Sequence, residues 1–275
     1  MIKPLMNGMK WLLLAAGSLV LLAGFQLFIL TEYTDLYFAW TIQPPLTGAF
    51  LGGGYFASFL IEFFASRKTK WAEARIAVPA VFTFTSLTLI ATLLHMNRFH
   101  FNSPMMIAQV AAWFWLSIYA VVPPVLLLMW IRQYLAPGED PARTSRFPTL
   151  LRLMLTVQAV IFLIAGVGLF VAPSIFAPYW PWTLTPLTSR AIGAWLIGIG
   201  VFAAHAVIEN DYKRSSAGLV GYLAFGLLEL VALLRYPANV HWLSTSAWLY
   251  LTILLSILIV GLYSCAKLPS ISKIH

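Results

Sequence analysis

Residues 40–47 read Trp-Thr-Ile-Gln-Pro-Pro-Leu-Thr, and residues 182–188 read Trp-Thr-Leu-Thr-Pro-Leu-Thr. Upstream of these stretches, residues such as Gly24 and Tyr37 recur 142 positions later as Gly166 and Tyr179. Downstream the shift is 141, because the second copy lacks one proline, and towards the end of the chain it becomes 135. These shifts, called the repeat register below, extend through nearly the whole chain and predict an internal duplication.

The composition predicts a membrane protein. Hydrophobic residues make up 61% of the 275 residues and charged residues 9%, with a mean hydropathy of +0.85, whereas about a quarter of the residues in a soluble domain are charged. A bilayer core about 30 Å thick needs about 20 apolar residues per helix. Eight continuous runs qualify, at residues 11–30, 48–65, 76–95, 107–131, 152–172, 189–208, 216–235 and 245–265. We therefore expect an all-α membrane protein with eight transmembrane helices.

The basic residues predict the orientation. Of the 17 Lys and Arg residues, only Arg98, Arg190 and Arg235 fall on one side of the predicted spans. By the positive-inside rule the other side, which holds both termini, is cytoplasmic. We thus expect a multi-pass protein of the cytoplasmic (inner) membrane. The net charge of +8 follows from this asymmetry and from attraction to anionic lipid, so it predicts the lipid bilayer as a partner and no nucleic acid.

The duplication divides the chain into two four-span repeats. Residues 1–132 form the first, residues 133–149 a polar cytoplasmic linker, and residues 150–275 the second. Since four is an even number, the second repeat enters the membrane in the same direction as the first. The repeats are therefore expected to be parallel and related by a pseudo-two-fold axis along the membrane normal.

Each repeat has a long, aromatic outer loop between its first two spans, at residues 33–47 and 173–188. Amphipathic rings are favoured at the level of the lipid headgroups, so the main expectation is an interfacial belt. The alternative is that both loops insert part of the way and line an outward cavity. The aromatic residues concerned are Tyr37, Trp40, Tyr179, Trp180 and Trp182.

Ionisable side chains inside the predicted spans are candidate functional residues, because burying a charge in lipid costs several kcal/mol. Glu62 and His205 lie towards the cytoplasmic side, and Glu229 lies in the outer half of the seventh span. The repeat register aligns Arg190 with an alanine and Glu229 with Thr88, so the second repeat has both charges and the first has neither. This joint difference predicts an ion pair between Arg190 and Glu229.

A stripe of hydroxyls follows one face of the third span, at Thr85, Thr88 and Thr92. Such hydroxyls usually bond to their own helix or to a neighbouring helix. That is the favoured interpretation here, and a hydrated path is the alternative.

The histidines His100 and His241 correspond in the repeat register, on short outer loops. Two such residues could ligate haem or a metal, but no further ligands lie near them, so a structural role is favoured. His205 is a lone histidine with the same disadvantage. The cofactor is therefore unknown, and no metal site is predicted. The chain also lacks the familiar catalytic motifs, which favours a protein that is not an enzyme.

The segment from Trp180 to Arg190, Trp-Pro-Trp-Thr-Leu-Thr-Pro-Leu-Thr-Ser-Arg, with Gly193 and Trp195 following it, resembles a segment of uncharacterised bacterial polytopic membrane proteins. The first copy departs from it at Phe38, Gln43 and Ala49. The resemblance covers one loop and the start of one span. It implies a polytopic membrane protein and no particular activity.

Three functions remain open. The preferred one is a non-catalytic scaffold or accessory subunit that packs against other membrane subunits. The first alternative is a transporter or channel for a small or amphiphilic solute. Transporters often have broken spans, and here only the fourth span, at Pro123 and Pro124, carries that signal. The second alternative is a redox component that binds haem, quinone or pigment.

Overall fold

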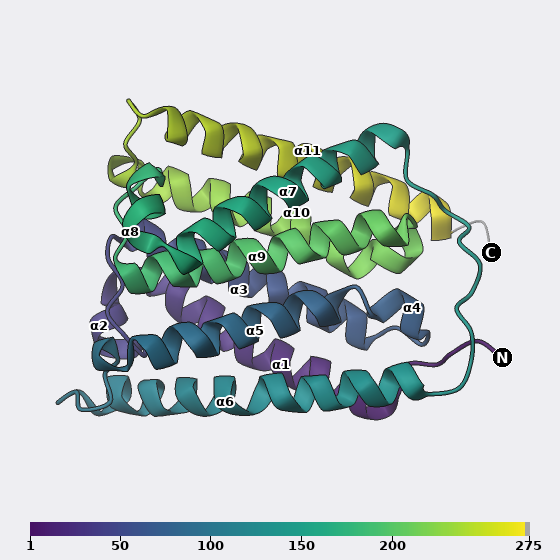
Figure 1. Ribbon diagram of the computed structural model, residues 1–275, viewed down its shortest axis with the longest axis horizontal. Helices are drawn as coiled ribbons and strands as arrows, with labels where there is room; N and C mark the ends of the chain where they lie inside the picture. The colour runs from purple at the N-terminus through teal and green to yellow at the C-terminus, as the bar shows by residue number, and fades with distance from the viewer. Residues whose placement is uncertain (273–275) are drawn as a thin grey trace.

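Eight long helices run side by side through the molecule (Figure 1). The computed structural model describes the backbone of residues 1–272 and the side chains of residues 1–268. Each of the eight is long and apolar enough to cross a membrane, which confirms the predicted all-α membrane protein. They are α1 with its π-helical extension η1 (Asn7–Ile29), α3 (Pro45–Ser66), α5 (Ala77–Leu94), α6 (Met106–Leu135), α7 (Thr149–Val171), α9 (Pro186–Glu209), α10 (Tyr212–Arg235) and α11 (Thr245–Ser272).

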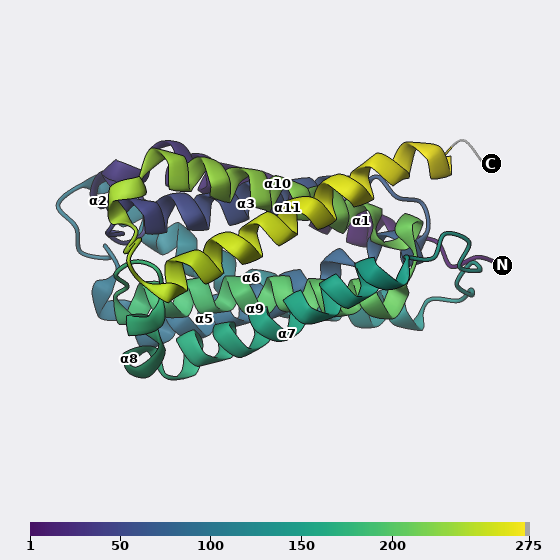
Figure 2. The same cartoon turned by 90° about the horizontal axis from the view of Figure 1, so that it is seen from above.

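The N-terminus and the end of α11 lie at the same end of the bundle, together with the linker between the halves (Figures 1 and 2). We call this the terminal end, and it also holds the short helix α4 (Trp71–Ala74). The opposite end, called the loop end, holds short helical turns in the two long loops and after α5 and α10. These turns are η2 (Thr31–Tyr33), α2 (Thr34–Tyr37), η3 (Met96–Arg98), α8 (Pro173–Phe176), η4 (Ala177–Tyr179) and η5 (Pro237–Asn239).

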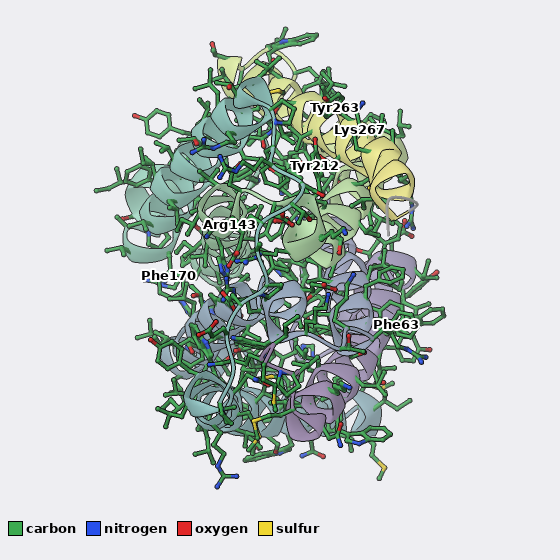
Figure 3. The ribbon with its side chains drawn as sticks, turned by 90° about the vertical axis from the view of Figure 1, so that its right-hand side faces the viewer. Phe63, Arg143, Phe170, Tyr212, Tyr263 and Lys267 are labelled. Atoms are coloured by element: carbon green, nitrogen blue, oxygen red, sulfur yellow. The ribbon has the colours of Figure 1, made fainter. Side chains whose placement is uncertain are left out.

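The long helices form a closed ring in the order α1, α3, α10, α11, α7, α9, α5 and α6, and α6 returns to α1. Helices α3 and α9 also touch across the ring. Helices α1 and α6 therefore lie at one edge of the bundle, and α7 and α11 lie at the other, as Figure 3 shows from the terminal end. Helix α6 stays continuous although it contains Pro123 and Pro124.

The helix contacts come in pairs. The packing of α1 on α3 has a counterpart in α7 on α9, and the packing of α10 on α11 has one in α5 on α6. Helix α3 also packs against α10 from the other half of the chain, and α9 also packs against α5. The two halves are thus interleaved, and one hydrophobic core runs through both.

Glycines allow the closest of these contacts. A Cβ atom at Gly193 on α9 would lie 2.9 Å from the backbone nitrogen of Phe170 on α7, closer than real Cβ atoms approach. Gly52 on α3 is similarly held against the backbone of Leu27 and Phe28. A side chain at either position would push the two helices apart, so small residues set the helix spacing here.

Candidate functional site

The loop between α7 and α9 turns into the protein at Trp182, which is 0% exposed. Its Nε1 donates a hydrogen bond to Thr47 Oγ1 at 2.9 Å, in the first turn of α3. Trp40 is also buried, at 3% exposed. These two tryptophans therefore pack inside the protein and do not belong to an exposed aromatic belt. Tyr37 and Tyr179 are exposed, as a surface belt requires.

Trp182 belongs to a cluster of three rings, called the Trp182 cluster, with Trp180 and Tyr250. The ring centroids of Trp180 and Trp182 lie 5.1 Å apart, and Tyr250 lies 5.4 Å from Trp182 and 5.8 Å from Trp180. All three pairs are T-shaped, a favourable geometry for aromatic rings. Phe50 of α3 packs edge-on against Trp180. The inserted loop is thereby fixed to α11 and α3.

A cavity of about 190 Å³ lies beside the Trp182 cluster, among α7, α9, α10 and α11. Ile161 and Leu249 line it and are also 36% and 58% exposed on the outside of the bundle. The cavity therefore reaches the lateral surface between α7 and α11. Its walls are mainly apolar and include Phe50, Phe162, Trp180, Leu196, Phe225, Glu229 and Tyr250. We call it the Glu229 cavity.

Glu229 on α10 is 1% exposed. Its Oε2 accepts a hydrogen bond from the Tyr250 hydroxyl at 3.1 Å, and its Oε1 has no hydrogen-bond partner. Gly53 on α3 leaves room for Oε1, since a Cβ there would come within 2.7 Å of it. No cation among the described residues forms an ion pair with Glu229. A buried acceptor without a partner is costly, so this carboxyl is suited to receive a donor.

The predicted ion pair between Arg190 and Glu229 is wrong. Arg190 Nη1 lies 2.7 Å from His95 Nε2, at the end of α5, and 3.5 Å from the carbonyl oxygen of Pro186. The sequence missed this because α9 packs against α5, whereas α10 packs against α3, so the two charges face different neighbours. Burial, followed by the charges of Arg190 and Arg98, lowers the pKa of His95.

The first half of the chain has its own cluster of three rings, called the Trp40 cluster, formed by Phe38, Trp40 and Trp115. Their centroids lie 4.8, 4.9 and 5.2 Å apart. The repeat register pairs Phe38 with Trp180, Trp40 with Trp182 and Trp115 with Tyr250. The two clusters therefore join matching positions with similar ring spacings.

The space next to the Trp40 cluster is filled. Tyr55 and Tyr119 are buried there, and their hydroxyls lie 2.6 Å apart. Tyr55 packs edge-on against Trp115. The repeat register pairs Tyr55 with Leu196 and Tyr119 with Leu254, and both leucines line the Glu229 cavity. Smaller side chains at these two positions leave room for the cavity in the second half.

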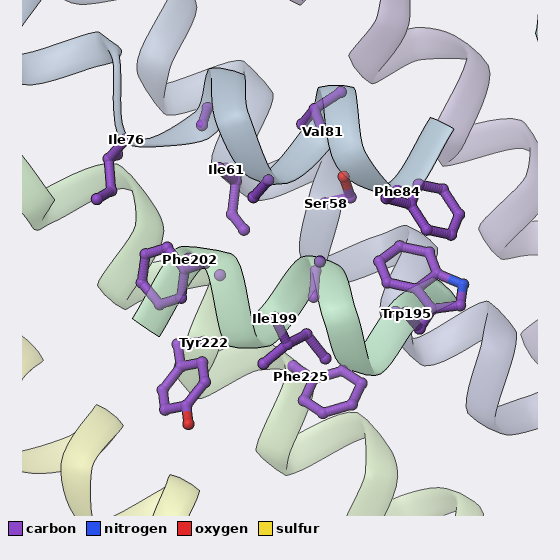
Figure 4. A pocket seen from close by; sticks show the side chains of 16 residues that line it. Ser58, Ile61, Ile76, Val81, Phe84, Trp195, Ile199, Phe202, Tyr222 and Phe225 are labelled. Atoms are coloured by element: carbon purple, nitrogen blue, oxygen red, sulfur yellow. The ribbon is translucent and has the colours of Figure 1, made fainter. Parts of the chain in front are cut away.

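A second, smaller cavity of about 50 Å³ lies in the middle of the ring, where α3, α5, α9 and α10 meet (Figure 4). Phe84 and Trp195 stack at one end of it, with ring centroids 4.0 Å apart, and Phe202 and Tyr222 lie towards the other end. Ser58 brings a hydroxyl to its wall. Its size and apolar lining indicate a packing gap.

Glu62 on α3 is 1% exposed, lies against Gly17 of α1 and does not line the Glu229 cavity. Ser58 Oγ donates to its Oε1 at 3.0 Å, and its Oε2 has no partner. His205, a lone histidine in the sequence, has a carboxyl neighbour on its own helix, with 3.3 Å between its Nε2 and Glu209 Oε1.

Glu209 belongs to a charge network at the terminal end that the sequence did not predict. Arg75 Nε lies 2.5 Å from Glu209 Oε1, and Arg214 Nη1 lies 3.0 Å from Glu209 Oε2. Asp140 of the linker adds a second carboxylate, 2.6 Å from Arg75. Burial lowers the pKa of Arg75, but the bonds and charges of Glu209 and Asp140 outweigh it and raise the pKa. This network holds the linker to the helix ends.

Two residues of the threonine stripe bond to their own helix, as favoured, whereas the buried hydroxyl of Thr88 has no hydrogen-bond partner. Thr85 Oγ1 donates to the carbonyl oxygen of Val81, and Thr92 Oγ1 donates to that of Thr88, both at 2.8 Å. Thr92 also accepts from Trp115 Nε1 at 3.0 Å. The stripe thus helps to fix the Trp40 cluster.

The two matching histidines differ in their contacts. Both ring nitrogens of His100 have partners, with Nε2 3.0 Å from Thr41 Oγ1 and Nδ1 2.9 Å from the carbonyl oxygen of Phe38. The backbone nitrogens of His100 and His241 donate to matching positions, the carbonyl oxygens of Ala39 and Pro181. Within the described residues, no group of three or more His, Cys, Asp and Glu is placed to hold a metal.

Comparisons of the chain with protein-family models, with curated proteins and with solved structures give no match.

Proposed function

We propose that this membrane protein binds a small amphiphilic molecule in the Glu229 cavity. The observation that carries the proposal is a buried carboxyl with one unpartnered oxygen, in the wall of an apolar cavity that reaches the side of the bundle. Binding pockets are typically apolar with a few polar groups that orient the ligand. Of the functions that the sequence suggests, this one is closest to a transporter or channel for an amphiphilic solute.

The polar head of this ligand carries a protonated amine. A carboxylate without a cation partner favours a positive head, and aromatic faces attract cations as well. Trp180, Tyr250 and Phe50 supply such rings close to Glu229. Since an apolar cavity of about 150 Å³ can hold a benzene ring, about 190 Å³ accommodates one ring or a short alkyl chain.

We propose in addition that the loop end faces away from the cytoplasm and that the two halves arose by duplication. The basic residues at the terminal end support the orientation through the positive-inside rule, and the paired helix contacts support the duplication. In this orientation Glu229, six residues before the end of α10 at Arg235, lies in the outer half of the membrane. The ligand would then enter from the outer leaflet, between α7 and α11.

Binding of octylamine to the purified protein in nanodiscs of neutral lipid tests the proposal. The double variant Leu196→Tyr with Leu254→Tyr introduces the residues of the first half and fills the cavity, so the affinity for octylamine should fall at least about tenfold, the equivalent of about 1.4 kcal/mol. Leu153→Tyr on the exposed face of α7 is the control and should bind as the unaltered protein does.

Other results would favour one of the competing functions. If octylamine binds no better than octanoate, or if the filled variant binds it equally well, the proposal is wrong. A protein that carries only partner chains after gentle purification would support the scaffold or accessory subunit. A visible absorption spectrum would support the redox component.

A further inference from the structure

A larger cleft lies on the surface at the loop end and is separate from the Glu229 cavity. It has a volume of about 680 Å³, between the end of α5 with η3 and the start of α9. This is within the range of small-molecule sites. Its lining mixes apolar and polar groups, including Trp40, Thr41, His95, Asn97, Arg98 and Thr185. We call it the Arg98 cleft.

The charge at this cleft is positive and uncompensated. Arg98 lines it and is exposed to solvent. Arg190 lies directly behind it, against His95 and Pro186, which both line the cleft. Because an arginine can only donate, His95 accepts through Nε2 and is neutral in this contact. Within the part of the chain whose side chains are described, neither arginine forms an ion pair.

A buried donor in the wall of the cleft also lacks a partner. Trp40 is 3% exposed, and its Nε1 makes no hydrogen bond. The matching nitrogen of Trp182 donates to Thr47. Thr188, which the repeat register pairs with Thr47, is instead bonded to Thr185 in the cap of α9. The indole N–H of Trp40 is thus left without the internal acceptor that its counterpart has.

At the loop end of the second half, Arg235 and Asn239 make hydrogen bonds within the protein. Arg235 donates to the carbonyl oxygen of Phe28 at 2.5 Å and to the Tyr236 hydroxyl at 3.1 Å. Asn239, which the repeat register pairs with Arg98, accepts from the backbone nitrogen of Leu46 at 3.4 Å. Arg235 and Asn239 are thus bonded within the protein, whereas the exposed Arg98 forms no ion pair with any described residue.

We infer that the Arg98 cleft binds the phosphate group of a solute or lipid through Arg98, with added positive charge from Arg190 behind His95 and Pro186, and that binding opens the indole N–H of Trp40, which is buried in this structure, to a phosphate oxygen. Arginine suits this role because its planar fork of donors matches phosphate oxygens. The positive end of the α9 dipole adds to the attraction. This site does not depend on the function proposed for the Glu229 cavity.

Calorimetric titration with inorganic phosphate, of the protein in phosphatidylcholine nanodiscs, tests whether the cleft binds the phosphate group of a solute. Native mass spectrometry after reconstitution with phosphatidylglycerol tests the lipid source. Arg98→Gln and Arg190→Gln should each weaken binding about tenfold or more, as expected for loss of a charge-assisted hydrogen bond. Arg235→Gln removes the same charge at the same end and should leave binding unchanged.

Trp40→Phe removes the indole N–H but keeps an aromatic ring. It should weaken phosphate binding while the thermal stability stays the same. Binding of phosphate without retention of lipid identifies a solute site, and selective retention of phosphatidylglycerol identifies a lipid site. If neither ligand binds, or if Arg235→Gln weakens binding as much as Arg98→Gln does, the inference is wrong.

Discussion

The two aromatic clusters at the loop end differ in where they leave space. Next to the Trp40 cluster, Tyr55 and Tyr119 fill the interior, and the Arg98 cleft is open at the surface. Next to the Trp182 cluster, the surface groups bond to one another, and the Glu229 cavity is open inside. Matching positions thus surround a polar surface cleft in one half and an apolar internal cavity in the other.

Few residues produce this difference. Two leucines in place of tyrosines leave room for the cavity, and Glu229 in place of Thr88 gives it a carboxyl. At the surface, Arg98 in place of Asn239 changes an internal hydrogen bond into a free charge. Shared positions therefore carry the scaffold, and unshared positions carry the two candidate sites.

The largest effect should follow from removing the two tyrosine rings that fill the interior next to the Trp40 cluster. The double variant Tyr55→Leu with Tyr119→Leu removes two buried rings and the hydrogen bond between their hydroxyls. We expect a loss of about 2–5 kcal/mol in the free energy of unfolding, measured by denaturant titration in mixed micelles. Tyr33→Leu with Tyr134→Leu, at exposed positions, is the control. If both double variants had the same free energy of unfolding, Tyr55 and Tyr119 would not be filling the interior of the first half.

The next effect concerns the carboxyl of the cavity. Glu229→Thr introduces the residue of the first half, and should weaken octylamine binding by about tenfold to a hundredfold, since a hydrogen bond to a charged group contributes about 1.5–3 kcal/mol. Glu62→Gln changes a carboxyl that is equally buried but lies outside the cavity. It should leave the affinity unchanged. An equal loss in both variants would indicate a general effect on folding.

Much of the fold could be predicted from the sequence, and the contacts between the halves could not. Hydrophobic run length is a local property, so all eight spans were found within a few residues. Interleaving depends on which helices meet in space, and no local pattern encodes that. The Arg190 prediction failed for this reason, since its partner is set by the packing of α9 on α5.

The sites were predicted only in part. Glu229 is recognisable in the sequence because a charge inside a span is unusual, and the aromatic loops are compatible with partial insertion as well as with an interfacial belt. The repeat register could have revealed the pairs of Tyr55 with Leu196 and of Tyr119 with Leu254, since both were visible as differences between the copies. Burial of Trp40 and Trp182 was missed because aromatic loops are ordinarily interfacial.

A smaller effect distinguishes the two tryptophans. Trp182→Phe breaks the hydrogen bond to Thr47 and should cost about 1 kcal/mol of stability. Trp40→Phe removes a donor that has no partner, so the free energy of unfolding should stay the same or increase. Denaturant titration of both variants measures the difference. If Trp40→Phe is more destabilising than Trp182→Phe, the indole N–H of Trp40 has an acceptor in the folded protein. The proposed difference between the two tryptophans is then wrong.

The smallest effect depends on pH and belongs to the first half alone. His95 has a lowered pKa, because of burial and the neighbouring charges of Arg190 and Arg98. The unfolded chain therefore binds a proton more readily, so the stability from this group is present above the ordinary pKa of about 6.5 and is lost as the pH falls through the lower folded value.

His95 is partly exposed, and the solvent screens the effect to a few tenths of a kcal/mol. Tyr236 occupies the matching position, and burial together with its hydrogen bond to Glu32 raises its pKa, so it stays neutral between pH 5 and pH 7.5. The drop in unfolding free energy between these two pH values should shrink slightly in His95→Gln, which keeps an acceptor for Arg190. It should stay unchanged in Tyr236→Phe. A pH dependence that both variants share would place its origin outside these two matching positions.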